Sequence, residues 1–586
     1  MIANFIDRAK RGESIYICDV RDAFSSLGAA VECVVELAVG APKHYNIPLP
    51  RADTEEETAF IKEYFYANIY NLISALGGKR IVMYIKPGDD HIEKLCATLD
   101  DVFQTTVPRG ERTGYGKCLN VTDRVNAAMG CPDFRFEIIS GEYNEAIPQT
   151  ENPASDALAA FRGAAAAAQN TVLCGVDVGG TDIKVVGTVN GRIRALKEYD
   201  WRPSDMTSID ELISPITLIV RAIRAALTMP DSDRGNELRA AMLNKDATDE
   251  EMRLATDAAE KEFGEFVLLD GIGVNFPDVV ISNKIVGGET PKTQGIRKCS
   301  ADYETEFGRI SGLDDMLLTQ CKPGGAVNIA NDGSLAAYTA AVELAHSARA
   351  VEVADGVFAH TLGTDMGSGW IDENGEIPQI PLELYNCVID LGNYPARGYE
   401  ATDLRSVRNF NTGIAGIPQK YAGQSGAYRF AIEYFTQSAP ELYQELLDKG
   451  FIEETENGVY VLLSPQDMRK PLLEHIMKLA DNGQPQAERV FREIGKYLAA
   501  IWRETEFILC PRAKRRVLFG RFIKRQNCFR LMQEGAREVL DVILDAGDDS
   551  IAFTPLMLDL KADPVYTVAQ FGQAVGAAYF AAAKLI

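Results

Sequence analysis

The sequence predicts a mixed α/β protein of two related lobes, with an additional α/β domain at the N-terminus. Two observations lead to this fold class. A pattern of strand, glycine turn and strand occurs twice, about 180 residues apart, as expected when two lobes face one ligand. Ahead of both patterns, strand-like and helix-like segments alternate through residues 1–150, which is typical of a compact α/β domain.

The first pattern occupies residues 171–196. The mainly apolar run Val172–Val178 meets the pair Gly179-Gly180, and a second run, Ile183–Val189, meets Asn190-Gly191. We therefore expect a strand, a glycine turn, a strand, an Asn-Gly hairpin and a third strand. Glycines at the first turn let backbone N–H groups approach a ligand closely, as phosphate binding requires. An ordinary tight hairpin explains this stretch, taken alone, about as well.

The second pattern occupies residues 358–378. An apolar lead-in runs into Gly363-Thr364-Asp365, which is followed by Gly367, Gly369 and an Asn374-Gly375 turn. One glycine hairpin is common in proteins. The repetition of the same plan in one chain favours two phosphate-binding turns on two facing lobes.

Four stretches, in family order, resemble the actin-like sugar kinases. VDVGGTDIK is similar to their first phosphate motif and TLGTDMGSGW to their second. VNIANDGSLAA is similar to the Asn-Asp stretch of hexokinases and bacterial ROK kinases, and residues 271–295 resemble the sugar loop of both. The resemblance covers residues 171–586. It implies a two-lobed actin-like (ribonuclease H-like) kinase fold that transfers the γ-phosphate of ATP to a sugar hydroxyl.

The resemblance also implies ATP and Mg²⁺ as cofactors. Asp177 lies at the mouth of the first glycine turn and is expected to hold a hydrated Mg²⁺. The candidate phosphate or ATP ligands are Gly179, Gly180, Thr181, Lys184, Gly363, Thr364, Gly367 and Gly520.

Asp332 is the candidate catalytic base. Val327–Ala330 reads as a short strand, and Asn331-Asp332 stand at its end, before a helix that starts near Ser334. A carboxylate opposite two phosphate turns is placed to accept a proton from a hydroxyl that attacks the γ-phosphate. The alternative is that Asp332 only caps the helix that it precedes.

Hydrogen-bonding residues in the sugar loop suit the hydroxyls of a polyol, because such a substrate is recognised by directional donors and acceptors. A polar surface loop is the alternative. The resemblance adds Glu383, where these kinases present a sugar-binding glutamate, and Asn386, where ROK enzymes carry a histidine; a glutamate at a helix start is the other interpretation of Glu383. The candidate substrate ligands are Asn275, Lys292, Thr293, Asn331, Asp332, Glu383 and Asn386.

The chain departs from the family in two places. The family shows two or three successive glycines at its adenosine-contacting turn, whereas this chain has only Gly520, followed by Arg521. Adenine binding is still expected, with Arg521 stacking on the base or meeting a phosphate. ROK kinases usually carry a cysteine-rich zinc signature, but residues 398–416 contain no cysteine, so we expect that metal to be absent.

The composition of the chain argues against some classes of binding partner. A formal charge of -24 argues against nucleic acid, and no apolar run reaches the ~18 residues of a membrane span. The eleven cysteines are scattered and no signal peptide is visible, so a reduced, cytoplasmic protein is expected. A small-molecule sugar is the predicted partner, and a homodimer stays open.

The chain divides into four predicted parts: an N-terminal α/β domain (1–150), a linker with an Ala-rich helix (151–170), a first lobe with the sugar loop (171–330, joined by the C-terminal helix 567–586), and a second lobe with helical insertions (331–566). The N-terminal domain holds 16 Lys and Arg against 22 Asp and Glu, which disfavours a DNA reader like that of ROK repressors. An oligomerisation or regulatory role is the default for it.

Within the N-terminal domain, buried strands are expected at Ser14–Val20 and Arg80–Ile85, another strand at Phe134–Ile139, and helices at Glu56–Leu76 and His91–Phe103. For the whole chain, the leading hypothesis is a hexokinase- or glucokinase-like sugar kinase. A non-catalytic sugar- or nucleotide-sensing regulator on the same fold and an ATP-hydrolysing switch are the alternatives.

Overall fold

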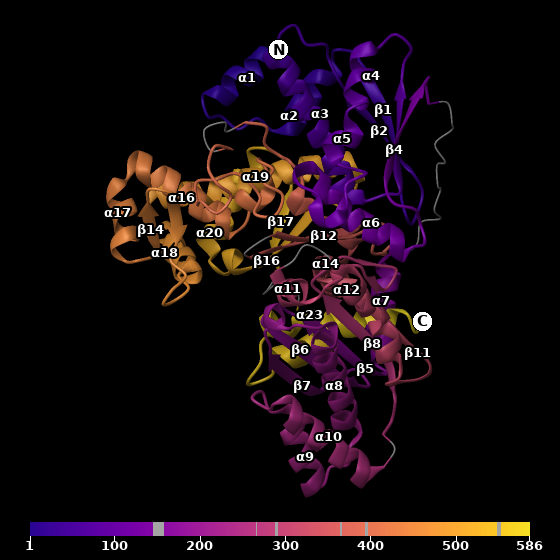
Figure 1. The fold of residues 1–586 in the computed structure, drawn as a ribbon. Helices are drawn as coiled ribbons and strands as arrows, with labels where there is room; N and C mark the ends of the chain where they lie inside the picture. Colours follow the sequence, from indigo (N-terminus) through magenta and orange to yellow (C-terminus); the bar gives the residue numbers. More distant parts are fainter. Residues whose placement is uncertain (144–156, 265, 288–290, 364–365, 393–396, 548–551) are drawn as a thin grey trace.

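The computed structural model describes residues 1–143, 157–264, 266–287, 291–363, 366–392, 397–547 and 552–586 (Figure 1). Three bodies follow one another along the chain. We refer to residues 1–143 as the N-terminal unit, and to the bodies built on the second and third large sheets as the first and second lobes. Within the described residues, no helix is both long and apolar enough to cross a membrane.

The N-terminal unit is a four-stranded sheet in the order β2-β1-β3-β4, in which β3 and β4 are parallel and the other pairs antiparallel. Its elements are α1 (Ile2–Lys10), α2 (Ile17–Ser25), β1 (Ala30–Glu36), β2 (Lys43–Pro48), α3 (Glu55–Leu76), β3 (Arg80–Ile85), α4 (Asp90–Cys96), α5 (Leu99–Phe103), α6 (Cys118–Ala128) and β4 (Arg135–Ser140).

Of two strands predicted in this unit, one is confirmed and one is wrong. The strand predicted at Arg80–Ile85 is confirmed as β3, a central strand whose apolar residues are buried. The strand predicted at Ser14–Val20 is wrong, because α2 begins at Ile17. Ile17, Val20 and Phe24 recur at helical spacing and are buried together, so the burial of one helix face prevails over the β propensity of the short apolar run.

The first lobe carries a five-stranded sheet in the order β11-β8-β5-β6-β7. Strands β5, β6 and β7 form an antiparallel meander, and β8 and β11 add to the other side of β5 in parallel. Its elements are β5 (Val172–Val178), β6 (Asp182–Val189), β7 (Arg192–Asp200), α8 (Ile209–Thr228), α9 (Asp233–Leu243), α10 (Asp249–Phe263), β8 (Leu269–Phe276), β9 (Val280–Ile281), β10 (Lys284–Ile285), α11 (Gln294–Cys299), α12 (Tyr303–Gly308), α13 (Leu313–Leu318) and β11 (Cys321–Asn331).

The second lobe repeats part of this plan in a sheet of order β13-β12-β16-β17, with an antiparallel hairpin β12–β13 and parallel additions β16 and β17. Its elements are α14 (Asp332–Ala345), β12 (Val357–Leu362), β13 (Met366–Ile371), α16 (Gln424–Ser438), α17 (Pro440–Asp448), β14 (Ile452–Thr455), β15 (Gly458–Val461), α18 (Arg469–Asp481), α19 (Pro485–Leu509), β16 (Arg515–Gly520), α20 (Gln526–Arg537), β17 (Ile543–Ala546) and α22 (Pro555–Lys561).

Two sheets that each begin with an antiparallel hairpin and continue with parallel strands confirm the predicted two-lobed actin-like fold class. The sheets are not equal copies. The first has a third meander strand, β7, for which the second has no counterpart among its described residues.

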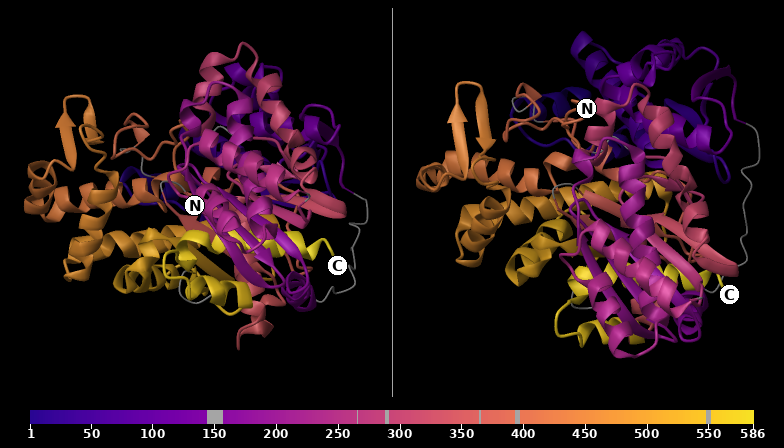
Figure 2. Two further views of the ribbon diagram at one scale, coloured as in Figure 1. Left: turned by 90° about the horizontal axis from the view of Figure 1, so that it is seen from below. Right: turned by 60° about the horizontal axis from the view of Figure 1, so that its bottom comes forward.

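Two Ala-rich helices join the lobes: α7 (Ala157–Ala168) and the C-terminal α23 (Val568–Ala583). In Figure 2, α23 (yellow) runs against the strands of the first lobe. This close packing depends on Gly273 of β8, where an added Cβ would lie 1.8 Å from the carbonyl oxygen of Ala577. The helix also packs on α14, and a Cβ at Gly576 would lie 1.8 Å from Oγ1 of Thr339. The end of the chain therefore packs beside the start of the first lobe.

Candidate active site

Three parallel strands of the first lobe end at one edge of its sheet. In the strand register Asp177 of β5 lies opposite Asn275 of β8, and Asn275 lies opposite Ala330 of β11, one residue before Asn331. The side-chain amide of Asn275 donates a hydrogen bond to Oδ1 of Asp177 over 2.6 Å. Residues from three distant parts of the sequence are thus held side by side by the parallel pairing.

Asp177 is half-buried at the end of β5, among charged and polar side chains. Burial raises its pKa to about 6; the carboxylates of Asp182 and Asp332 act in the same direction, while Lys184 and the hydrogen bond from Asn275 oppose them. Lys184 forms an ion pair with Asp182. The electrostatic effect of Asp332 on Asp177 places these two candidate residues near each other, although they lie 155 positions apart in the sequence.

The first glycine turn joins β5 to β6. The N–H of Gly179 donates to the carbonyl of Asp182 over 2.8 Å, and the indole N–H of Trp201 donates to the carbonyl of Gly179 over 3.0 Å. These bonds fix the turn while Gly180 and Thr181 stay exposed. Lys292 of the sugar loop lies beside the turn, since a Cβ at Gly180 would be 3.2 Å from Cε of Lys292.

Asp332 is the first residue of α14, and Asn331 is the residue that caps this helix. Oδ1 of Asn331 accepts hydrogen bonds from the N–H groups of Gly333 and Ser334 over 2.9 and 3.4 Å. The capping role considered for Asp332 therefore belongs to its neighbour. Asp332 keeps one local hydrogen bond, from the N–H of Gly333 to its Oδ1 over 2.8 Å.

The second glycine hairpin, β12–β13, lies directly against the start of α14. A Cβ at Gly369 would be 1.8 Å from the carbonyl oxygen of Gly333, so only a glycine permits this approach. The hairpin carries Gly363 and Gly367 at its tip, and the N–H of Gln424 donates to the carbonyl of Gly363 over 3.0 Å. The predicted ligand Thr364 lies outside the described residues.

Gly520 ends β16 beside the same hairpin tip. It lies opposite Leu362 in the parallel register and has a φ of 109°, and a Cβ there would be 2.3 Å from the carbonyl oxygen of Leu362. The structure therefore brings Gly520 next to Gly363. Arg521, which follows, forms a 2.8 Å ion pair with Glu474 of α18. Its guanidinium is directed to that carboxylate in this structure.

The candidate residues Thr293 and Asn275 are both buried but differ in their hydrogen bonding. Thr293 is buried, and its hydroxyl accepts a hydrogen bond from Tyr303 over 3.0 Å. Asn275 is buried as well, but its Oδ1 has no hydrogen-bond partner among the described residues. The structure thus leaves the acceptor atom of Asn275, unlike the hydroxyl of Thr293, without a described partner.

Sequence reasoning missed Asp278. This residue follows β8 by two positions and is 6% exposed, and its backbone carbonyl accepts a hydrogen bond from Nδ2 of Asn331 over 3.0 Å. Burial raises the pKa of Asp278 to about 6, with Lys292 lowering it and Asp332 raising it. The signal was a carboxylate in the Phe276-Pro277-Asp278 segment, just past the strand that carries Asn275.

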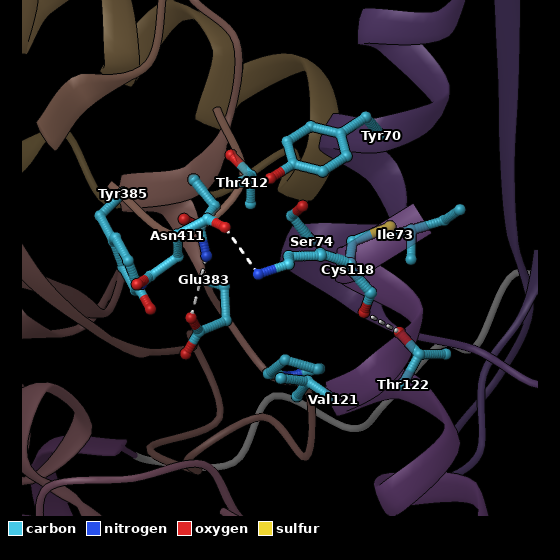
Figure 3. Close-up of a pocket in the computed structure, with 13 residues that line it drawn as sticks. Tyr70, Ile73, Ser74, Cys118, Val121, Thr122, Glu383, Tyr385, Asn411 and Thr412 are labelled. Carbon is cyan, nitrogen blue, oxygen red and sulfur yellow. Dashed lines mark hydrogen bonds between the residues drawn. The ribbon is translucent and has the colours of Figure 1, made fainter. Parts of the chain in front are cut away.

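Glu383 and Asn386 line a pocket beside the N-terminal unit. They flank a 3₁₀ turn, Leu384–Asn386, where the amide of Asn386 donates to Oε2 of Glu383 over 3.2 Å. Figure 3 shows their pocket between the turn and helices α3 and α6, with Tyr70 and Ser74 on the far wall. The described residues that line it include neither Asn275 nor Asp332. These two predicted sugar ligands therefore line one pocket together.

No protein-family model and no curated protein matches the sequence. Similar folds are found among solved structures. The chain resembles the ROK sugar kinases.

A ROK family glucokinase from Streptomyces griseus, solved with glucose and AMPPNP, is 17% identical and aligns over 70% of this chain and 98% of its own length, with a TM-score of 0.36. A ROK hexokinase from Thermus thermophilus is 14% identical over 70% of this chain and 97% of its own, with a TM-score of 0.36. A ROK family transcriptional regulator, a homologue of the E. coli MLC protein, is 12% identical over 71% and 81%, with a TM-score of 0.37. At these values the likenesses decide nothing about activity.

Proposed function

We propose that this chain is an ATP-dependent carbohydrate kinase that transfers the γ-phosphate to a hydroxyl of a sugar. One observation carries the proposal: the first turn of α14, which bears Asp332, is held between the sheet edge of the first lobe and the glycine hairpin of the second. Hydrogen bonding at Asn331 fixes it to the first lobe, and the contact of Gly333 with Gly369 fixes it to the second. A base between two phosphate turns is the geometry that phosphoryl transfer to an alcohol needs.

Asp332 accepts the proton of the attacking hydroxyl in this proposal. Asn275 orients the sugar through its free acceptor oxygen, and the turns at Gly179–Thr181 and at Gly363 and Gly367 contact the phosphates. Because the hydroxyl must approach in line with the bond that breaks, positioning contributes more than the proton transfer itself.

The residues present fit Mg²⁺ bound with a nucleotide. Within the described residues, no group of three or more His, Cys, Asp or Glu side chains could hold a metal by itself. Mg²⁺ commonly keeps several waters and takes one or two carboxylates together with substrate phosphates, so Asp177 at the end of β5 suffices. The bound ion would neutralise charge on the phosphates, while Asn275 holds the Asp177 carboxylate in place.

The test is turnover of an Asp332→Asn variant with a panel of hexoses, amino sugars and polyols, followed as ADP release. We expect kcat to fall by about 10²- to 10⁴-fold while ATP affinity changes little. Asp315→Asn is the matched control, because Asp315 is an exposed aspartate of α13 away from the site. Near-normal turnover of Asp332→Asn would remove Asp332 from the role of base.

A non-catalytic sensor is the second candidate. The ion pair of Arg521 with Glu474 favours it, because the guanidinium next to the altered adenosine turn then contacts a carboxylate of the chain rather than a nucleotide. In the same assay the two functions differ. Stimulation of ADP release by one sugar supports the kinase, whereas sugar binding without ADP release supports the sensor. Sugar-independent hydrolysis would point instead to an ATP-driven switch.

A further inference from the structure

Two buried acceptor atoms at the edge of the first-lobe sheet have no hydrogen-bond partner among the described residues. They are Oδ1 of Asn275 and Oδ1 of Asp278. Both residues are more than nine-tenths buried, at 1% and 6% exposure. A polar atom that is buried and unpaired destabilises the fold, so such an atom marks strain, a bound water or a ligand.

The cations around Asp278 do not account for its free oxygen. Arg124 of α6 is near enough to lower the pKa of Asp278, but its Nε and Nη2 donate to the carboxylate of Glu304 over 2.8 and 2.6 Å. Lys292 also lowers that pKa, and its chain lies against the turn at Gly180. Arg297 lowers that pKa as well, and its guanidinium lies over the ring of Tyr303, 4.8 Å from the ring centroid. Oδ1 of Asp278 accepts no hydrogen bond from any of these three cations in the described structure.

Asp278 is tied to the residue that precedes the proposed base. Nδ2 of Asn331 donates to the backbone carbonyl of Asp278 over 3.0 Å, and Asp332 follows Asn331 directly. Asn275 precedes Asp278 by three residues on the same strand end. The two free acceptors thus belong to one short segment, held against the segment that bears Asp332.

We propose that Asp278 is a specificity-determining residue of the acceptor site. It accepts a hydrogen bond from a hydroxyl or ammonium group next to the hydroxyl that is phosphorylated, and Asn275 accepts a second. The substrate class is therefore a sugar with donors on adjacent carbons, either a vicinal diol or an amino alcohol. This inference rests on the proposed kinase function and names the acceptor that the same site selects.

The chemistry predicts strong discrimination against deoxy analogues. A site built around acceptors that a substrate must satisfy rejects the analogue that lacks the donor, because the acceptor is then buried without a partner. A carboxylate accepts from a hydroxyl or an ammonium group more strongly than a neutral oxygen does. Asp278 is expected to contribute more to this discrimination than Asn275.

The experiment compares wild type, Asp278→Ala, Asp278→Asn and the control Asp315→Asn, each as the full chain. The probes are D-glucose, D-mannose, D-glucosamine and 2-deoxy-D-glucose, with both ADP release and direct sugar binding by calorimetry as readouts. In Asp278→Ala we expect the KM for the best sugar to rise about 10- to 100-fold, with kcat within about threefold of wild type and the KM for ATP unchanged. Asp278→Asn keeps one acceptor oxygen, so its KM for the best sugar should lie between those of wild type and Asp278→Ala.

A binding role of Asp278 is distinguished from a merely structural one by the ratio of kcat/KM for a sugar to kcat/KM for its deoxy analogue. This ratio should fall toward one in Asp278→Ala, whereas partial unfolding would lower activity on every probe alike. An unchanged KM and an unchanged ratio in a variant with a wild-type melting curve would overturn the inference. If wild type binds a sugar without turnover and Asp278→Ala does not bind it, the kinase proposal fails and the acceptor role of Asp278 stands. If wild type binds no member of the panel, the acceptor role fails too.

Discussion

The N-terminal unit meets the two lobes through two interfaces of different construction. Against the second lobe it shares one continuous hydrophobic core, which runs from α1 through α3 into α16 and α19. Against the first lobe it contributes to a small cluster in which Val125 is buried with Val279, Ile281 and Val286. In Figure 1 the unit lies over α19 and reaches α12 of the first lobe through α6.

The polar contacts show the same contrast. At the second-lobe interface, Arg21 donates to both oxygens of Glu504 over 2.8 and 2.7 Å, and both side chains are nearly inaccessible, at 7% and 2% exposure. At the first-lobe interface, Arg124 and Arg109 share the carboxylate of Glu304, which is 38% exposed. We therefore expect the unit to move as one body with the second lobe, and any opening of the lobes to separate it from the first.

The strongest way to break this comparison is to disrupt the second-lobe interface with Arg21→Met. The variant leaves Glu504 buried, with Asn71 as its one remaining side-chain donor among the described residues, over 2.8 Å. Removing one partner of a buried pair typically costs about 3–5 kcal/mol, because the other charge stays in a low dielectric. Chemical denaturation should show a loss of this size in the free energy of unfolding.

Arg503→Met is the matched control for Arg21→Met, since Arg503 of the same α19 pairs with Asp19 and Asp22 at the surface. Exposed pairs contribute about 0–1 kcal/mol. Equal losses in the two variants would show that the second-lobe interface is no tighter than a surface contact.

A second prediction concerns the pH dependence of stability that Asp278 contributes near the first-lobe interface. The pKa of Asp278 is raised from its ordinary 3.8 to about 6 by burial, so between these pH values the folded state holds a proton that the unfolded state has lost. The free energy of unfolding contributed by Asp278 therefore falls as pH rises from about 4 to 6 and stays lowered above that. Asp278→Asn should raise stability at pH 7.5 by about 1–3 kcal/mol and leave it nearly unchanged at pH 4.

Denaturant titrations of wild type and Asp278→Asn at pH 4, 6 and 7.5 measure this window. Together with the expected loss of sugar affinity, a gain in stability would mark Asp278 as a residue kept for binding at the expense of the fold. A variant that is less stable than wild type at pH 7.5 would contradict the assignment of a burial-strained carboxylate.

Local patterns predicted the elements that position the site. The pairs Gly179-Gly180 and Asn190-Gly191 end strands whose bounds the structure gives as β5 and β6, because glycine and Asn-Gly turns are specified by a few adjacent residues. The helix after Asn331 was expected to start near Ser334, two residues after its start in the structure, and a capping role for Asp332 was the alternative left open.

Long-range relations were not predictable in this way. Asp278 carries no motif, and its burial beside Asn331 follows only from the parallel pairing of β8 with β11. Glu383 fits a family pattern in the sequence, but the pattern did not predict that α3 and α6 of the N-terminal unit line a pocket with it. Contacts between bodies far apart in sequence leave no local signal.

The smallest expected effect is at the first-lobe interface itself, in Arg124→Met. The variant loses the hydrogen bonds to Glu304 but keeps the apolar cluster around Val125, and Glu304 stays 38% exposed, so the free energy of unfolding should fall by only about 1 kcal/mol. Solution scattering should nevertheless show a larger radius of gyration without sugar, and addition of the best sugar should restore the compact profile, because closure excludes water before transfer. Arg109→Met, which removes one weaker contact of 3.0 Å to the same carboxylate, is the control and should change the profile less. Superimposable profiles for wild type and Arg124→Met, with and without sugar, would show that the first-lobe interface does not govern lobe opening.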